Sequence, residues 1–282
     1  MAEVKKETTI EEQCRILESR GCIIGDKNFC ETVLSQVNYY RLTAYFLPFR
    51  DKQGNYKPGT TFETIYRIYE FDRKLRNIIF GAIEKIEIAF RAKLAHFHAM
   101  RYGPLGYLDP SNFNERHDVE KFQRNIDREI ENNQNVPFIK HHIDNYEGQF
   151  PIWVISEIFT FGMLSFFYND LQTQDKKELM GQQYRKVCGW LRCCTDLRNI
   201  CAHYGRLYYR VFPASPAGLG LDEKEKTKLW GSVLALKMLY PDKDNWNCEV
   251  VPALEALFEQ YSDAICLRHI AFPSNWAEQL LK

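Results

Sequence analysis

The sequence lacks the short motifs that identify many common enzymes. It contains no P-loop, no G-x-G-x-x-G and no G-x-S-x-G pattern, which argues against the usual nucleotide-binding and serine-hydrolase functions. Its nine cysteines include no C-x-x-C pair, so neither a disulfide framework nor a zinc ribbon is indicated. His96-x-His98 and His141-His142 have no carboxylate or cysteine partners at metal-ligand spacing. We therefore expect reduced thiols, no bound metal and no cofactor.

Long apolar runs are also missing. The first residues, MAEVKKETTIEEQ, do not form the apolar stretch of a signal peptide. The nearest candidate for a membrane span is PIWVISEIFTFGMLSFFY at 151–168, but Glu157 and Gly162 interrupt it and no pattern of basic loops flanks it. We interpret 151–168 as a buried helix and expect a cytoplasmic protein that does not associate with membranes.

The chain has no net charge, but its charges are unevenly distributed. It carries 37 basic and 37 acidic residues, which argues against binding of nucleic acid over its whole surface. Two segments are basic, 41–101 with a net charge of +6 and 184–210 with +5. The other three, 1–40, 102–183 and 211–282, carry −2, −6 and −3. This pattern is typical of a protein with a local surface that attracts phosphate groups.

Helical patterns dominate the sequence, and strand patterns are weak apart from a short hairpin pattern near 47–58. Thr9-x-x-Glu12 and Thr60-x-x-Glu63 predict the starts of two helices, the second running to about residue 102. We predict an all-α fold, with residues 1–60 as an N-terminal helical extension packed on a core and 61–282 as the main helical domain. Further helices are predicted near 26–37, 115–133, 184–203, 222–239, 252–268 and 273–281.

One polar cluster lies in the second basic segment, in the stretch DLRNICAHYGR at 196–206. On a helix Asn199 and His203 lie about 40° apart, and the long side chain of Arg198 can reach the same surface. A histidine can move protons at the 2′-hydroxyl and the 5′-oxygen of RNA, a guanidinium can hold the phosphate, and an amide can orient either group. These residues therefore favour metal-independent RNA cleavage. One histidine cannot easily make both proton transfers, which favours two copies facing each other across a two-fold axis.

The spacing of this cluster is not specific, because Arg91 and His96 repeat it. Glu84 and Glu87 lie two turns and one turn before Arg91 and are natural salt-bridge partners for it. We therefore interpret the Arg91–His96 copy as structural, or as support for the other copy. The copy at 198–203 has basic neighbours instead, and the RNA-binding residues predicted from them are Arg192, Arg206 and Arg210.

Five stretches of the chain are similar to one known family. They are NYYRLTAYFLPFRD at 38–51, IYEFDRKLRNIIFGAIEKIEIAFRAKLAH at 68–96, GPLGYLDP at 103–110, PIWVISEIFTFGMLSFFY at 151–168 and WLRCCTDLRNICAHYGRLYYR at 190–210. In this order they resemble the Abi-like (AbiD/AbiF) abortive-infection family, within the HEPN superfamily of helical RNA-acting domains, and the resemblance covers roughly residues 8–270.

The resemblance implies a HEPN-like helical bundle and a homodimer in which two R-N-x-x-x-H motifs face each other. It implies a ribonuclease toxin used in phage defence, with RNA as substrate and, as in some relatives, a structured non-coding RNA as regulatory partner. On the matching positions of this chain, it implies Arg198, Asn199 and His203 as the catalytic residues.

Two other functions stay open from the residues alone. In a non-catalytic RNA-binding module the same side chains would grip a partner RNA without cutting it, and in a protein-interaction switch they would build a dimer interface. A separate aromatic run also has two interpretations, since its rings can stack on bases but are more typical of a helical core, which we favour. The run comprises Tyr39, Tyr40, Tyr45, Phe46 and Phe49.

Overall fold

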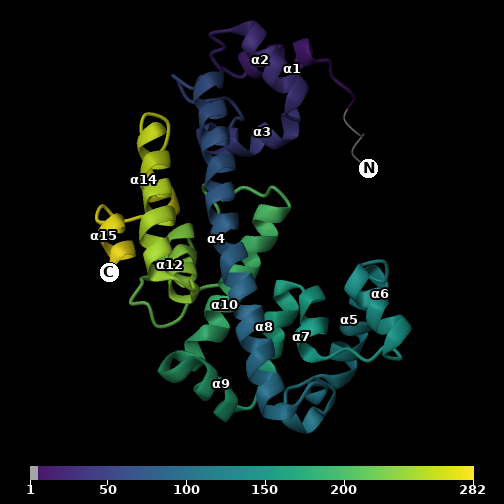
Figure 1. The fold of residues 1–282 in the computed structure, drawn as a ribbon. Helices are drawn as coiled ribbons and strands as arrows, with labels where there is room; N and C mark the ends of the chain where they lie inside the picture. The colour runs from purple at the N-terminus through teal and green to yellow at the C-terminus, as the bar shows by residue number, and fades with distance from the viewer. Residues whose placement is uncertain (1–5) are drawn as a thin grey trace. The chain divides into compact units, whose positions relative to one another are not determined.

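The computed structural model describes residues 6–282 as helices joined by turns and loops (Figure 1). No β-strand forms within that range, and the hairpin predicted near 47–58 is reduced to one isolated bridge between Arg50 and Tyr56. The predicted all-α fold is therefore confirmed. The contacts divide the chain into two compact units, one formed by the chain up to Arg76 with Ala253–Cys266, the other by Asn77–Pro252 with Leu267–Lys282. The domain boundary at residue 60 stays a prediction.

The first unit holds the N-terminal helices, the beginning of a very long helix and the end of a late one. These elements are α1 (Ile10–Ser19), α2 (Lys27–Gln36), α3 (Tyr39–Phe46), the 3-10 turn η1 (Leu47–Phe49), α4 (Phe62–Tyr102) and α14 (Val251–Gln260).

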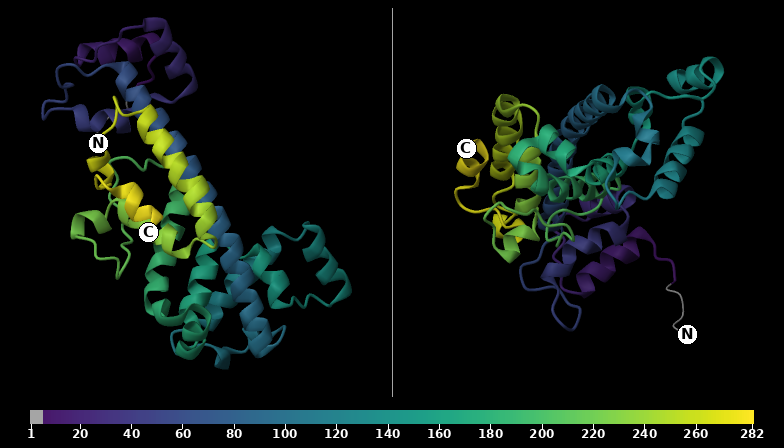
Figure 2. Two further views of the ribbon diagram at one scale, coloured as in Figure 1. Left: turned by 60° about the vertical axis from the view of Figure 1, so that its left-hand side comes forward. Right: turned by 90° about the horizontal axis from the view of Figure 1, so that it is seen from below.

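Aromatic contacts join the elements of the first unit. Phe29 of α2 stands edge-on to Tyr66 of α4, with ring centroids 5.3 Å apart. On the other side of α4, Phe71 contacts Phe258 of α14 at 6.0 Å, and α14 runs beside the first turns of α4 in both views (Figures 1 and 2). Because these contacts reach past the start of α4, the first turns of that helix belong with the N-terminal helices.

Side-chain caps fix where the first helices begin. Thr9 and Glu12 form the predicted capping box of α1. The predicted cap of α4 is wrong by one residue: Thr61 accepts the Thr64 N–H at 3.1 Å, whereas the Thr60 hydroxyl donates to the carbonyl of Lys57. Glu63 does not complete a capping box, because its carboxylate accepts the N–H groups of Gly25 and Asp26 in the turn before α2.

A buried polar network holds α3 to α4. The carboxylate of Asp72 is fully buried and accepts the Tyr45 hydroxyl and an Arg76 N–H, each at 2.6 Å. Burial of a charge is costly unless it is paired in this way. The nine cysteines of the chain are free thiols, and Cys14 and Cys30 are buried between α1 and α2 with their Sγ atoms 3.4 Å apart.

The second unit holds the remainder of α4 and most other helices. These are α5 (Val119–Asn132), α6 (Pro137–Asn145), α7 (Ile152–Ile155), α8 (Phe161–Asp170), α9 (Thr173–Met180), α10 (Tyr184–Ala202), α11 (Glu223–Lys226), α12 (Leu229–Leu239), α13 (Lys243–Asn245) and α15 (Trp276–Leu281). Shorter turns are η2 (Gly106–Leu108), η3 (Pro110–Asn112), η4 (Ser156–Ile158), η5 (Gly181–Gln183), the π-helical η6 (Trp246–Val250) and η7 (Leu267–Ile270).

Helix α10 of the second unit carries the candidate site. Its bounds agree closely with the helix predicted at 184–203. It contacts α8 and α12, and α8 in turn contacts α4 through the rings of Phe90 and Tyr168 at 5.7 Å. The apolar face predicted for α10 is buried throughout, which leaves its polar side chains on the opposite side. That buried face comprises Trp190, Leu191, Cys194, Leu197 and Cys201.

Two segments predicted as single helices are broken. Segment 151–168 is apolar and buried in part as expected, but η4 interrupts it and α8 restarts where the Thr160 hydroxyl accepts the Met163 N–H. Segment 222–239 divides at Thr227, whose carbonyl accepts the Phe212 N–H from a distant loop. None of the helices between residues 6 and 282 has the length and apolar character needed to span a bilayer.

Candidate functional site

The predicted motif lies at the carboxyl end of α10. Asn199 and His203 are exposed and one helical turn apart, and the His203 N–H still donates to the Asn199 carbonyl at 3.1 Å. His203 is the C-cap residue, so its imidazole stands where the helix stops. The structure therefore places Arg198, Asn199 and His203 at the carboxyl end of one helix.

A tight turn ends α10 immediately after His203. Tyr204 adopts a left-handed conformation with φ of 55°, and its N–H donates to Cys201. The Gly205 N–H donates back to the Ile200 carbonyl at 2.7 Å, which completes a Schellman motif. A Cβ on Gly205 would lie 3.0 Å from the Ile200 side chain and 3.2 Å from its carbonyl oxygen. The position of His203 thus depends on a turn in which a side chain at 205 would be tightly packed against Ile200.

A carboxylate on α4 forms an ion pair with the arginine of the motif. The Arg198 Nε atom lies 3.9 Å from Glu87 Oε2, and its Nη1 atom makes a long 3.5 Å contact with Asn199 Oδ1. The Arg198 side chain remains 35% exposed. One side of the guanidinium therefore faces the Glu87 carboxylate at ion-pair distance, while another is open to an anionic ligand.

Glu87 also pairs with Arg91, as predicted, at 3.0 Å. Arg91 donates to the Phe159 carbonyl at 2.9 Å and lies 3.7 Å from Glu157, so it ties α4 to the end of η4. The second copy of the spacing therefore touches the first: Glu87 joins Arg91 to Arg198. The sequence did not predict the contact between Glu87 and Arg198, because it depends on how α4 packs against α10.

Glu84 and His96, the other two residues predicted to act with Arg91, lie outside this network. Glu84 is exposed on α4, and the ion pairs of Arg91 within residues 6–282 are made with Glu87 and Glu157. His96 is exposed further along α4, in a shallow depression that it shares with Phe97.

The basic surroundings of the motif extend beyond the predicted residues. Arg192 is exposed on α10, and the Arg206 guanidinium lies 6.0 Å from the ring centre of Tyr209. Burial lowers the pKa of Lys228, and the nearby charges of Lys224 and Arg206 lower it further. Lys224 and Lys228 were missed because they lie in an acidic segment of the sequence, about twenty residues after the motif. Of the three predicted arginines, Arg210 is the one with a buried Nε that has no hydrogen-bond partner in the described chain.

The resulting arrangement is a basic, surface-exposed helix end that offers an imidazole, an amide and an anchored guanidinium. These groups can bind a phosphodiester and exchange protons with it. In the part of the chain that the structure describes, no three His, Cys, Asp or Glu side chains are grouped so that they could hold a metal ion.

Fold and site together define an all-helical protein with an Arg-Asn-His cluster suited to phosphate chemistry. The model of the Abi-like protein family matches residues 32–209, which is more than half of the chain and includes the whole motif. The chain therefore belongs to the Abi-like family, which links it to abortive infection, a form of phage defence. No curated protein and no solved structure matches the chain.

Proposed function

We propose that this protein is a metal-independent, HEPN-type endoribonuclease that acts in the cytoplasm as the toxin of an abortive-infection system. The observation that carries the proposal is the ion pair of Arg198 with Glu87 of α4, at the end of α10 that also exposes Asn199 and His203. Membership of the Abi-like family supports the biological role.

The chemistry follows from the groups available. An imidazole takes the proton from the ribose 2′-hydroxyl, and the resulting oxygen attacks the adjacent phosphorus. The P–O5′ bond breaks, and an imidazolium protonates the leaving 5′-oxygen. Arg198 stabilises the extra negative charge on the phosphorane oxygens, and Asn199 orients the phosphate or the base. The products carry a 2′,3′-cyclic phosphate and a 5′-hydroxyl, and no water is consumed.

This scheme needs two imidazoles in different protonation states, whereas the motif of one chain supplies one. Two copies that face each other across a two-fold axis supply both. Ile88, next to Glu87 on α4, leaves 58% of its surface exposed and is an apolar group beside the site that a second copy can cover. Ile88→Asp is expected to convert a dimer to a monomer in sedimentation, with loss of cleavage. Met100→Asp, at a still more exposed position on the same helix, is the control and leaves the dimer intact.

The direct test of the reaction is RNA incubated with the protein in excess EDTA, followed by analysis of the new ends. The proposal predicts cleavage with 2′,3′-cyclic phosphate and 5′-hydroxyl ends, and resistance of RNA whose 2′-hydroxyls are methylated. Cleavage that requires a divalent ion, or cleavage of the methylated RNA, would show that the 2′-hydroxyl is not the nucleophile.

A second candidate is a module that binds a partner RNA without cutting it. The single histidine of the motif in each chain favours it, because phosphate binding needs the basic groups and not the proton transfer. On this alternative His203→Ala keeps RNA affinity and biological effect while Arg198→Ala loses both. On the leading proposal His203→Ala keeps affinity and loses the biological effect.

A further inference from the structure

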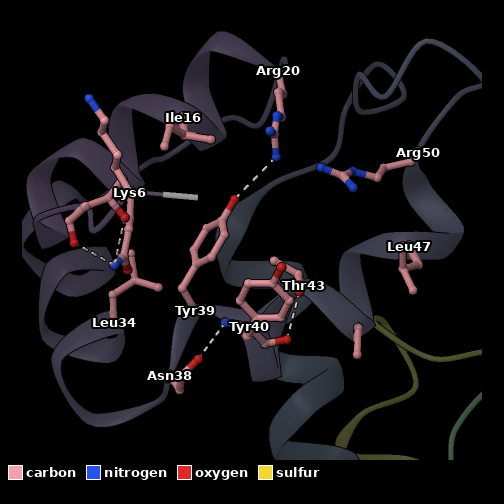
Figure 3. A pocket seen from close by; sticks show the side chains of 13 residues that line it. Lys6, Ile16, Arg20, Leu34, Asn38, Tyr39, Tyr40, Thr43, Leu47 and Arg50 are labelled. Atoms are coloured by element: carbon pink, nitrogen blue, oxygen red, sulfur yellow. Dashed lines mark hydrogen bonds between the residues drawn. The ribbon is translucent and has the colours of Figure 1, made fainter. Parts of the chain in front are cut away.

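The first unit contains a hollow of about 830 Å³ that none of the proposed chemistry uses. It opens between α1, α2 and α3 and is within the size range of small-molecule sites (Figure 3). Its walls combine the apolar side chains of Ile16, Leu34 and Leu47 with basic and tyrosine side chains. The hollow therefore offers apolar, basic and aromatic groups to a ligand.

The charge in the hollow is of one sign. Lys6, Arg20 and Arg50 line it, and no aspartate or glutamate of residues 6–282 is among its lining residues. None of these three forms an ion pair within residues 6–282, whereas Arg15 on the outer face of α1 is paired with Glu11 at 2.6 Å. Uncompensated positive charge in a concave site attracts an anion.

The two guanidinium groups converge. Arg20 Nη1 contacts the Tyr39 hydroxyl at 3.4 Å, and the Arg50 side chain extends towards Arg20, whereas the Lys6 ammonium points away from Tyr39 (Figure 3). Burial raises the pKa of the Tyr56 hydroxyl, and Arg50 and Arg20 both lie close enough for their charges to lower it. The Arg50 Nε atom is buried and makes no hydrogen bond to any described residue, although its guanidinium lies 5.5 Å from the Tyr56 ring centre.

Tyrosine rings stand beside these cations. The predicted aromatic run divides in the structure: Tyr45 and Phe46 are buried in the core, while Tyr40 is 70% exposed and Tyr39 is half-buried in the wall of the hollow. The expectation of a core role is therefore confirmed for Tyr45 and Phe46, whereas Phe49 is only half-buried. The hollow thus offers one tyrosine ring in contact with Arg20 and a second, exposed ring in its lining, which suits a ligand that carries both a planar base and a phosphate.

We propose that this hollow binds a nucleotide, with Arg20 and Arg50 on the phosphate and a tyrosine ring of α3 stacked on the base. The inference goes beyond the proposed cleavage reaction, since it concerns the first unit and uses none of the motif residues. The nucleotide is either a free mononucleotide or one unit of a single-stranded RNA, and both present the same phosphate and base. Guanidinium groups hold phosphate oxygens bidentately, and every nucleobase has a face that can stack on tyrosine.

The test measures binding in the full chain carrying His203→Ala, so that cleavage plays no part and failure of the ribonuclease proposal does not affect the result. Adenosine 5′-monophosphate and a single-stranded hexa-adenylate are titrated separately by calorimetry. We expect Arg20→Ala with Arg50→Ala to weaken binding at least ten-fold. Arg15→Ala, which removes one positive charge from the ion-paired outer face, is the control and changes affinity less than two-fold. Tyr40→Ala is expected to weaken binding about five-fold or more and Tyr40→Phe less than two-fold, because the ring face is retained.

If the binding of both ligands depends on Arg20 and Arg50, the hollow is a site for any nucleotide. If only the binding of the hexa-adenylate depends on them, the nucleotide is one unit of an RNA strand. Binding of neither ligand, or binding that Arg15→Ala weakens as much as the double variant, overturns the proposal. A hexaglutamate peptide that binds as tightly as the nucleotides also overturns it, because the hollow would then select negative charge alone. Tyr40 is largely exposed, so its two variants keep the test decisive even if the arginine variants fail to fold.

Discussion

Glu87 is the residue on which the geometry of the candidate site depends most directly. Its carboxylate lies 3.0 Å from Arg91 and 3.9 Å from Arg198, and its side chain is only 17% exposed. Hydrogen bonds to charged groups contribute about 1.5–3 kcal/mol when partly buried. Arg91 retains Glu157 and the Phe159 carbonyl, so we expect Glu87→Gln to lower the free energy of unfolding by about 1–2 kcal/mol rather than more.

The larger effect is expected on cleavage. Without the carboxylate, Arg198 loses the group that fixes one side of its guanidinium, and misplacement of a catalytic group by about 1 Å costs up to about 100-fold in rate. We therefore expect Glu87→Gln to lower the single-turnover rate on a short RNA by at least about ten-fold, measured well below the unfolding temperature. Glu84→Gln, one turn earlier and exposed on the same helix, is the matched control. It should change stability by less than about 0.5 kcal/mol and leave the rate within two-fold.

A double-variant cycle separates positioning from general destabilisation. If Glu87 acts through Arg198, adding Glu87→Gln to Arg198→Ala lowers the rate no further. A rate for Glu87→Gln equal to that of Glu84→Gln, or additive losses in the double variant, would refute the reasoning that the ion pair positions the guanidinium.

Two further predictions concern stability. Burial lowers the pKa of His98 to about 4, both of its ring nitrogens lack a hydrogen-bond partner within the described residues, and its ring stacks on Phe113. The imidazole of His98 is protonated near pH 6.5 in the unfolded chain, so the free energy of unfolding falls as the pH drops from 6.5 towards 4, by about 2 kcal/mol at pH 5. His98→Phe removes this part of the loss, which urea titrations at pH 5 and pH 7 measure. Gly205→Ala is expected to destabilise the end of α10 by about 1 kcal/mol and to lower cleavage, whereas Gly81→Ala, with open space around its Cβ in the middle of α4, stabilises by up to about 1 kcal/mol.

The outcomes that would contradict these two predictions are distinct. An equal pH dependence of unfolding in the His98→Phe variant and the unchanged protein would mean that the imidazole is not desolvated in the folded state. Cleavage by Gly205→Ala at the unchanged rate would mean that the turn after α10 does not position His203.

The helices and their buried faces could be predicted because they depend on local patterns. The capping box at Thr9, the apolar stripe of α10 and the Glu87–Arg91 pair all link residues of the same helix that are at most about three turns apart. Errors occurred where the local signal was ambiguous. Thr60 and Thr61 are adjacent and both fit a cap, and the apolar run at 151–168 contains no residue that by itself ends a helix at Ile155.

The candidate site could be predicted in its residues but not in its contacts. Arg198, Asn199 and His203 lie close together in the sequence, so their positions on one helix turn follow from the helix period. The pairing of Arg198 with Glu87 joins residues more than a hundred positions apart and depends on packing. Lys228 near Arg206 and the convergence of Arg20 with Arg50 are likewise tertiary, and the net charge of a segment does not reveal them.

The central claim is that the motif at the end of α10 cleaves RNA. It is tested most directly by the cleavage rate of His203→Ala beside that of His96→Ala, since both histidines follow an arginine by five positions and both are exposed. The account predicts that His203→Ala lowers the rate by at least about 100-fold, with RNA affinity retained, and that His96→Ala cleaves within about two-fold of the unchanged protein. Full activity of His203→Ala, or loss of activity in His96→Ala alone, would contradict it.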